Sequence, residues 1–314
     1  MTSHHQSHVI GPAIAHGLTR ALTTLGFKVT EDGPLQLTGK FTLLDEPASP
    51  NDTFNSSVLA ISVTLGDDMG RDLQVFSTRI TEATAPLIIS GATASFPILT
   101  SLENRQRISI DAVQQPSAQI EEQKTRSDEN SPFALEVLRR KGDGTLESLN
   151  PVAEEGRSTV IVANDDTLVF RLHNEAPFEC AVRLTIDGID WDGFAADKDW
   201  VAGTMHIVKP NEFLDVTSWY VSANDTPTFK VTSFPQGAAA LKGQTSSIRT
   251  ISAVFHACWE KDEQRPEDEF ETRSIDGNSE AIGFGASDEK SFQQVQRTVG
   301  RFRNIVSVRY RTEK

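Results

Sequence analysis

The segment 178–187 alternates between apolar and polar side chains, and this pattern restricts the fold more than any other stretch of the chain. Every second side chain in it is apolar, namely Phe178, Cys180, Val182, Leu184 and Ile186. The positions between them include Glu179, Arg183 and Thr185. Successive side chains of a strand point to opposite faces of a sheet. The segment is therefore predicted to be an antiparallel strand with one face in a core and the other toward solvent.

The same period of two recurs after residue 133 and predicts a β-rich region there. In 248–259 the apolar face carries Ile251, Ala253, Phe255, Ala257 and Trp259. Shorter segments of the same kind are 133–140, 158–163, 168–174, 205–208, 212–221, 228–234 and 304–311. Short strands separated by turn residues are typical of two packed sheets. We therefore expect 133–314 to form a mainly antiparallel β-sandwich-like domain, with an acidic loop over 260–281.

The N-terminal region has a different pattern, in which one helix precedes several strands. Over 9–26, apolar side chains recur at steps of three and four residues, which predicts an amphipathic helix. Three alternating segments follow and are predicted to be strands: 35–44, 58–65 and 72–81. We interpret 1–114 as a small α/β domain, so the whole chain belongs to the α+β class. The polar stretch 115–132 has no period and is predicted to be a linker.

The charge of the chain excludes some kinds of partner. The 314 residues carry a formal net charge of −14, and such a surface repels phosphate groups. We therefore expect neither general binding to nucleic acid nor docking on anionic lipid. No apolar run reaches the length of a membrane-spanning helix, so no transmembrane segment is expected.

Two compartments are compatible with the start of the sequence. The first ten residues are polar and lack the basic and apolar regions of a signal peptide, which favours the cytoplasm. If a leader preceded this sequence and was removed, the cell envelope is the alternative.

The two cysteines of the chain, Cys180 and Cys258, each lie in a predicted strand. A chain of this size with two cysteines does not have a disulfide framework. Each cysteine is either a buried free thiol that packs as a small apolar side chain, or half of a single disulfide between the sheets.

A group of carboxylates is a candidate metal site. Asp187, Asp190 and Asp192 end the strand 178–187 and continue into a loop that also contains Gly188. Calcium takes six to eight oxygen ligands, and clustered carboxylates at the end of a strand can supply several of them. The spacing differs from that of an EF-hand loop. The alternative is a solvated turn, in which Asp and Gly are common for backbone reasons.

Aromatic side chains in the same region are candidates for a ligand or partner site. They are Trp191, Trp200, Trp219 and Tyr220. Exposed aromatic rings on loops can stack on a sugar ring or anchor a protein partner. The alternative is that these rings cap the ends of the core, and the exposure of the rings distinguishes the two.

The sequence contains no linear motif of catalysis. It has no G-x-S-x-G elbow, no P-loop, no H-E-x-x-H and no C-x-x-C motif. The histidines His173, His206 and His256 fall inside strand patterns, which favours packed or surface side chains over general bases. We therefore expect that the protein is not an enzyme. An active site assembled from residues distant in sequence is the alternative.

Several segments of the second half share a combination of motifs. They are Ala181–Ile189, Ile207–Glu212, Thr217–Tyr220, Phe229–Phe234, Ile251–Trp259, Gly283–Gly285 and Val299–Tyr310. Together they resemble an uncharacterised β-rich domain of planctomycete-type bacteria, over roughly residues 133–314. This resemblance implies a β-rich fold and no particular chemistry.

The N-terminal part carries a second resemblance. A predicted helix precedes Leu37-Thr-Gly-Lys-Phe41, and the predicted strand 58–65 follows. This order resembles the second half of the α/β domain in envelope lipoproteins of the curli-secretion type, although the usual first strand is missing. The resemblance implies association with the cell envelope and a role in assembly.

These observations favour a non-catalytic structural or protein-interaction module of a bacterial assembly. Its partner is expected to be another protein or a second copy of the chain. One alternative is a β-sandwich module that binds carbohydrate or calcium, and calcium is the one cofactor that the sequence suggests. The other alternative is an enzyme whose active site has no linear motif.

Overall fold

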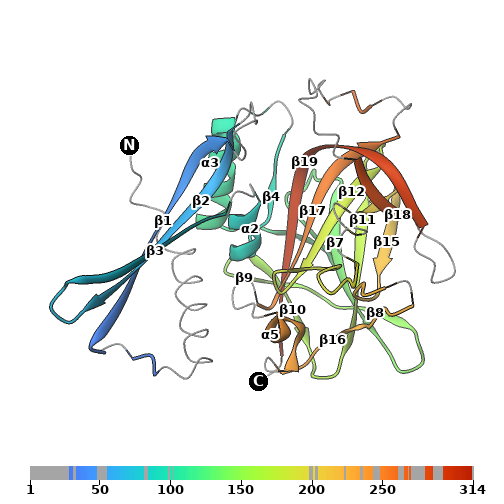
Figure 1. Ribbon diagram of the computed structural model, residues 1–314. Helices are drawn as coiled ribbons and strands as arrows, with labels where there is room; N and C mark the ends of the chain where they lie inside the picture. Colours follow the sequence, from blue (N-terminus) through green and yellow to red (C-terminus); the bar gives the residue numbers. More distant parts are fainter. Residues whose placement is uncertain are drawn as a thin grey trace.

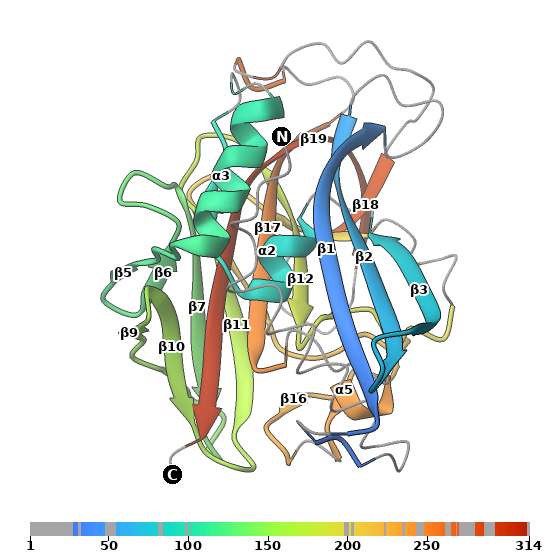
Figure 2. The same cartoon turned by 90° about the vertical axis from the view of Figure 1, so that its left-hand side faces the viewer.

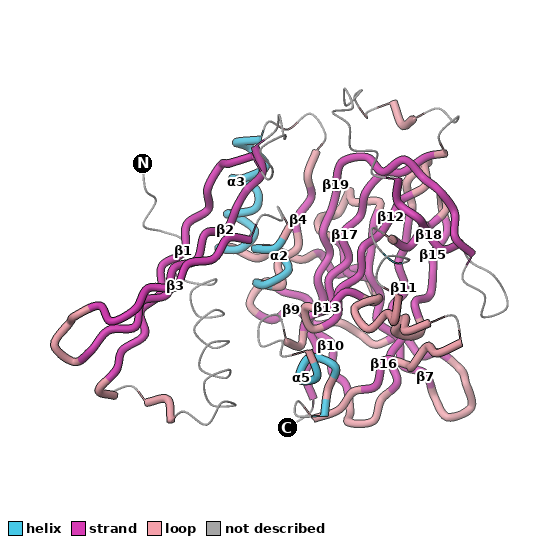
Figure 3. The backbone as a smooth tube through the Cα atoms, viewed as in Figure 1, coloured by secondary structure: helices cyan, strands magenta, loops and turns pink. Residues whose placement is uncertain are grey.

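Three β-sheets make up most of the molecule (Figure 1, Figure 3). Nearly all neighbouring strands in them are antiparallel, the exceptions being two parallel pairs in the largest sheet. The prediction of a β-rich, mainly antiparallel chain is confirmed. The computed structural model describes residues 28–30, 33–47, 55–80, 84–97, 100, 102–197, 201, 204–222, 224–233, 236–242, 248–260, 265–267, 269, 280–285 and 293–312.

The largest sheet has nine strands. They are β4 (Ala94–Ser95), β9 (Val152–Glu154), β10 (Arg157–Val162), β12 (Cys180–Ile186), β13 (Ile189–Asp190), β14 (Met205–Val208), β17 (Thr250–Trp259), β18 (Glu280–Gly285) and β19 (Gln293–Thr312). β10 runs parallel to β19 and β14 runs parallel to β18, whereas the other pairs are antiparallel. β19 pairs with four strands, namely β4, β10, β17 and β18. It therefore connects the two halves of this sheet.

A second sheet of seven strands packs against one face of the nine-stranded sheet. Its strands are β5 (Gln119–Glu121), β6 (Lys124–Arg126), β7 (Phe133–Arg140), β8 (Leu146–Ser148), β11 (Thr167–Asn174), β15 (Glu212–Val216) and β16 (Phe229–Lys230). Phe170 of this sheet belongs to the same buried cluster as Leu184 and Val306 of the nine-stranded sheet. The rings of Phe133 and Phe255, one from each sheet, stack with their centroids 5.0 Å apart. A common core therefore fills the space between the two sheets.

Two helices cover the other face of the nine-stranded sheet (Figure 2). They are α2 (Ala85–Ser90) and α3 (Leu102–Gln114). Leu87 of α2 and Val113 of α3 pack with Val254 and Ile305 of the sheet. β17 and the segment 303–308 of β19 are buried on both faces, because each alternates between the common core and this helix-covered side. Among the described residues, no helix is both long and apolar enough to cross a membrane.

The prediction of a linker over 115–132 is wrong for residues 119–126. These residues form β5 and β6, which pair with each other, and β6 also pairs with β7. Thr125 is buried, and its hydroxyl lies 2.6 Å from the hydroxyl of Ser158 in the nine-stranded sheet. Strands of three residues are too short to produce a period in the sequence, so the polar composition concealed them.

Two predicted elements cannot be compared in full with the structure. The helix over 9–26 and most of the acidic loop over 260–281 lie outside the described residues. The three strands predicted between 35 and 81 correspond to a third sheet, which is separate from the other two. The division into domains at 1–114 and 133–314 stays a prediction, and α2 and α3, which precede that boundary, pack on the nine-stranded sheet.

Candidate functional site

The third sheet is open at both edges. It consists of β1 (Leu35–Pro47), β2 (Asn55–Asp67) and β3 (Asp72–Ile80), with β2 in the middle. All 13 residues of β1 pair with β2. Within the part of the chain that the structure describes, neither β1 nor β3 has a second neighbouring strand. Each edge therefore presents a row of backbone N–H and C=O groups that another strand can pair with.

The turn between β2 and β3 projects away from the two larger sheets (Figure 1). The Asp67 carboxylate accepts hydrogen bonds from the backbone N–H groups of Met69 at 3.0 Å and Arg71 at 2.8 Å. Gly70 has a φ of +76°, a conformation that is strained for most residues with a Cβ atom. The hairpin is thus stabilised by contacts within its own turn.

The register of β1 and β2 places apolar side chains on one face of this sheet. Leu37 lies opposite Leu65, and directly opposite residues share a face. Leu35 lies two positions before Leu37 and therefore on the same face. Leu35 is 56% exposed and Leu37 is 42% exposed. Neighbouring apolar side chains with this exposure are a feature of interaction surfaces.

The opposite edge has exposed apolar side chains as well. Leu73 and Val75 of β3 are 52% and 50% exposed. Each edge strand of the sheet therefore combines exposed apolar side chains with free backbone groups. An extended protein segment binds to such an edge by adding a strand, in which main-chain hydrogen bonds supply affinity and side chains supply specificity.

The three predicted calcium ligands have three different partners. Asp187 accepts hydrogen bonds from the Tyr310 hydroxyl at 2.7 and 2.8 Å. Asp190 forms two hydrogen bonds with Arg183, at 2.7 and 2.9 Å. Asp192 accepts a hydrogen bond from a threonine hydroxyl at 3.2 Å. In the described residues, no three side chains that could bind a metal gather at one point, so the predicted calcium ligands are not brought together.

The backbone explains why acidic residues follow β12. Asp187 and Gly188 form the two-residue turn between β12 and β13, and Ile186 pairs with Ile189 across it. Their φ angles are +54° and +75°. Positive φ at both positions is typical of a type I′ turn, in which Asp-Gly is a preferred sequence. The interpretation of this segment as a turn therefore fits the structure.

Three of the four aromatic residues predicted to form a ligand site lie in the core. Trp191, Trp219 and Tyr220 are all buried in the cluster between the two sheets. The Trp191 ring meets the Tyr220 ring edge-on, with centroids 5.6 Å apart. The prediction of an exposed platform is wrong for these three rings, because they fill one part of the core. Trp200 lies outside the described residues.

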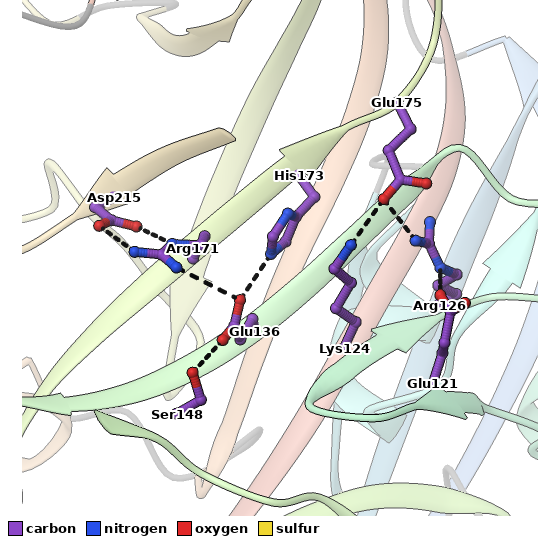
Figure 4. A network of polar contacts seen from close by, with 9 residues as sticks. All are labelled: Glu121, Lys124, Arg126, Glu136, Ser148, Arg171, His173, Glu175 and Asp215. Carbon is purple, nitrogen blue, oxygen red and sulfur yellow. Dashed lines mark hydrogen bonds and ion pairs between the residues drawn. The ribbon is translucent and has the colours of Figure 1, made fainter. Parts of the chain in front are cut away.

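A network of polar contacts lies on the seven-stranded sheet (Figure 4). It is on the face opposite the common core, because Glu136 alternates in β7 with Leu135 and Val137, which belong to that core. The centre of the network is Glu136, which accepts hydrogen bonds from His173 Nε2 at 2.8 Å and from the hydroxyl of Ser148. Arg171 lies 3.9 Å from Glu136 and forms hydrogen bonds of 2.7 and 2.9 Å with Asp215. Burial acts to raise the pKa of Glu136, but these hydrogen bonds and the nearby Arg171 hold it below its ordinary value.

The direction of these hydrogen bonds determines what the network can do. Ser148 donates to Glu136, and His173 contacts the same carboxylate. A serine nucleophile requires a hydrogen bond between its hydroxyl and a base such as histidine. The contacts of Ser148 and His173 instead both go to the carboxylate of Glu136 and satisfy its hydrogen-bonding needs.

On the same face, ion pairs connect β6 with Glu175, the residue that follows β11 (Figure 4). Glu175 accepts hydrogen bonds from Lys124 at 2.9 Å and Arg126 at 2.7 Å. Burial acts to raise the pKa of Glu175, but the two cations lower it to about 2. Arg126 also bonds to Glu121 of β5 at 2.9 Å. These ion pairs account for the polar composition of the segment 119–126.

Cys180 and Cys258 are both buried free thiols. Cys180 belongs to the common core, whereas Cys258 packs with Ala181 and Ile207. Because Ala181 follows Cys180 in β12, the two thiols point to opposite faces of the sheet. Burial raises the pKa of both thiols, that of Cys258 to about 12. Both therefore stay protonated and unreactive at neutral pH.

Comparison of the chain with protein-family models, with curated proteins and with solved structures finds no match.

Proposed function

We propose that this chain is a non-catalytic protein-interaction module that self-associates through its three-stranded sheet. One observation carries the proposal: free backbone groups and exposed apolar side chains coincide on β1. A solvent-exposed edge strand with apolar side chains is prone to pair with another chain unless charge, proline or a bulge prevents it. In β1, the segment from Leu35 to Gly39 contains no charged residue and no proline, whereas the rest of the strand contains Lys40, Asp45, Glu46 and Pro47. The proposed pairing is therefore through Leu35–Gly39.

The occupant of the edge that we propose is β1 of a second copy. Antiparallel pairing of two β1 strands is two-fold symmetric, and two-fold dimers are the most common oligomers. This pairing makes one continuous six-stranded sheet from the two copies. It also brings Leu35 and Leu37 of both copies onto shared surfaces, where their exposed area is reduced.

The buried cluster shared by the seven-stranded and nine-stranded sheets supports a β-sandwich as the body of the module. The contacts of Ser148 and His173 support a role without catalysis. The setting that we propose is a bacterial assembly, in the cell envelope, and it rests on the resemblance of residues 37–41 and 58–65 to curli-secretion-type lipoproteins.

Light scattering at a series of protein concentrations tests the proposal. Over about 1 to 100 µM, the mass of the wild-type protein is expected to rise from one copy to two. Leu37→Lys places a charge at the paired edge and is expected to weaken the dimer by about tenfold or more. A wild-type protein that stays a monomer throughout would overturn self-association.

A matched variant on the opposite edge tests which strand pairs. Val75→Lys changes a similarly exposed side chain of β3 and is expected to leave the dimer unchanged. If Val75→Lys dissociates the dimer and Leu37→Lys does not, the proposed pairing through β1 is wrong. Circular dichroism of both variants checks that the fold is kept.

A further inference from the structure

Two arginine side chains meet at the end of α2. Arg157 is the first residue of β10 and Arg309 lies near the end of β19, and these two strands run side by side (Figure 2). Both guanidinium groups donate a hydrogen bond to the backbone carbonyl of Ser90, Arg157 Nε at 3.3 Å and Arg309 Nη2 at 3.1 Å. Because both nitrogen atoms contact one oxygen atom, the two positive charges are neighbours.

The positive charge of this arginine pair is poorly balanced. Within the residues that the structure describes, the one ion-pair contact of the two arginines is that of Arg157 Nη1 with Glu155 Oε2, at 4.0 Å. The Glu155 side chain is 88% exposed, whereas the Arg157 side chain is 8% exposed. A contact of this length to a solvated carboxylate is weak. The pair therefore has a net positive charge.

Burial makes this charge costly. Arg157 is buried and Arg309 is half-buried. Burial lowers the pKa of both arginines, and the charge of Arg309 lowers the pKa of Arg157 further, against the opposite effect of Glu155. A charge that is removed from water without a counter-charge destabilises the folded state. An anion from solution that binds between the two arginines would remove this cost.

The contact with Ser90 uses a small part of the donors. A guanidinium group has five N–H groups in a planar fork that fits two oxygen atoms of a carboxylate or a phosphate. Each arginine uses one N–H for Ser90, the last residue of α2, where positive charge is favourable. In the described part of the chain, the other N–H groups of the pair form no hydrogen bond. They are therefore available to a ligand with several acceptor oxygens.

We propose that Arg157 and Arg309 bind a phosphate group with two negative charges, either free or as the monoester of a small molecule. Such a group carries about −1.5 to −2 charges at pH 7 and has several strong acceptor oxygens, so it balances both arginines. A carboxylate or a phosphate diester carries one negative charge and leaves one arginine unbalanced. On binding, the phosphate takes the place of the exposed Glu155 carboxylate next to Arg157.

Two features of the molecule are compatible with this site. The net charge of −14 opposes the approach of an anion, but its effect is screened beyond about 8 Å in physiological salt and does not cancel direct contacts. None of the residues of the site belongs to the three-stranded sheet. The proposal therefore does not depend on self-association.

Titration calorimetry with four matched anions tests this proposal. Inorganic phosphate and glycerol 3-phosphate carry two charges at about pH 7.5, whereas acetate and dimethyl phosphate carry one. At least one of the first two is expected to bind at one site per chain, about tenfold or more tightly than either of the last two. Tighter binding of glycerol 3-phosphate would support a monoester as the ligand, and tighter binding of inorganic phosphate the free anion. No binding of either at about 10 mM, or equally tight binding of acetate, would overturn the proposal.

Two variants and a control locate the binding. Arg309→Gln removes one charge of the pair and is expected to weaken phosphate binding by about tenfold or more. Arg139→Gln removes the same charge from the seven-stranded sheet, where Arg139 has carboxylates of its own, and is expected to bind like the wild type. Unchanged binding in Arg309→Gln would show that the anion binds elsewhere.

The second variant, Glu155→Gln, changes an exposed side chain and does not depend on how well Arg309→Gln folds. It removes the carboxylate that competes with the ligand, so phosphate is expected to bind about threefold or more tightly than in the wild type. Weaker or unchanged binding in Glu155→Gln would contradict the exchange of this carboxylate for phosphate. Circular dichroism of all three variants without ligand checks that the fold is kept.

Discussion

Two regions of the molecule have strands with the same alternating pattern. One is the body, which consists of the packed seven-stranded and nine-stranded sheets, and the other is the three-stranded sheet. They differ in what covers the apolar face of their strands. In the body, Phe170 and Leu184 are fully buried between two sheets. In the three-stranded sheet, Leu35 and Leu37 remain exposed. Burying one such side chain contributes about 1.5–3 kcal/mol. The body therefore supplies most of the stability, and the three-stranded sheet leaves apolar side chains exposed.

This difference shows that the same alternating pattern occurs in strands with a covered apolar face and in strands with an exposed one. Alternation predicts that a segment is a strand, because it reports which side chains share a face. It does not report whether that face meets another part of the same chain. A face covered from within stabilises the fold, and a face left open is available for association.

The largest loss of stability that we predict comes from removing a buried ring at the contact between the two packed sheets. Phe255→Ala removes a fully buried ring that stacks on Phe133 and is expected to lower the free energy of unfolding by about 3–5 kcal/mol. Urea denaturation measures the loss. Leu73→Ala in the three-stranded sheet is the control, with an expected change within about 0.5 kcal/mol. Equal losses of unfolding free energy in the two variants would contradict the conclusion that the body supplies most of the stability.

Acid is predicted to destabilise the body through two histidines, His206, which is buried, and His256, which is partly buried. Burial lowers the pKa of His206 to about 3 and that of His256 to about 4, from an ordinary value of 6.5. Both histidines are neutral in the folded protein and gain a proton on unfolding at pH values below 6.5. Their contribution to the free energy of unfolding is therefore complete above pH 6.5. It falls as the pH drops toward the pKa values of the folded protein. The expected loss is about 1.4 kcal/mol per pH unit for each histidine.

Urea denaturation at pH 7, 6 and 5 checks this slope. His206→Gln is expected to reduce the slope by about half, since one of the two protons is then no longer taken up. The segment 28–80 contains no histidine, so the three-stranded sheet has no part in this effect. A free energy of unfolding that is equal at pH 7 and pH 5 would contradict the neutral state of these two histidines in the folded protein.

A smaller effect is predicted where a polar contact links the two sheets. Thr125→Val removes the hydroxyl that lies 2.6 Å from that of Ser158 and leaves a buried group without this partner. The expected loss is about 1–3 kcal/mol in urea denaturation. Thr38→Val, on the exposed β1 strand, is the matched control and is expected to change the stability by less than about 0.5 kcal/mol.

Much of the strand content could be predicted from alternation alone. β7 and β14 coincide with the predicted segments 133–140 and 205–208. The alternation in β12 and β17 also places Cys180 and Cys258 on opposite faces, where the structure has them as free thiols. The alternation does not reveal β5 and β6, because strands of three residues are too short to give a period.

The candidate sites were harder to predict, and the reason is distance along the chain. Asp187 and Trp219 were singled out separately, one for a metal and one for a ligand. In the structure both line the same cavity, together with Tyr310. Nothing in a linear pattern relates residues so far apart, since only the pairing of the sheets brings them together. The exposure of Leu37 is equally invisible in the sequence, because it depends on what the rest of the chain leaves uncovered.

The position of β19 in the nine-stranded sheet has a consequence for the order of folding. Thr93, just before β4, and Ser307 of β19 are hydrogen-bonded although 214 residues separate them. During synthesis, β4, β10 and β17 leave the ribosome before the strand that joins them exists. The sheet is therefore completed after translation of residues 293–312, and until then the uncovered strand edges are surfaces on which a chaperone can act. Contacts of such long sequence separation also make folding slow.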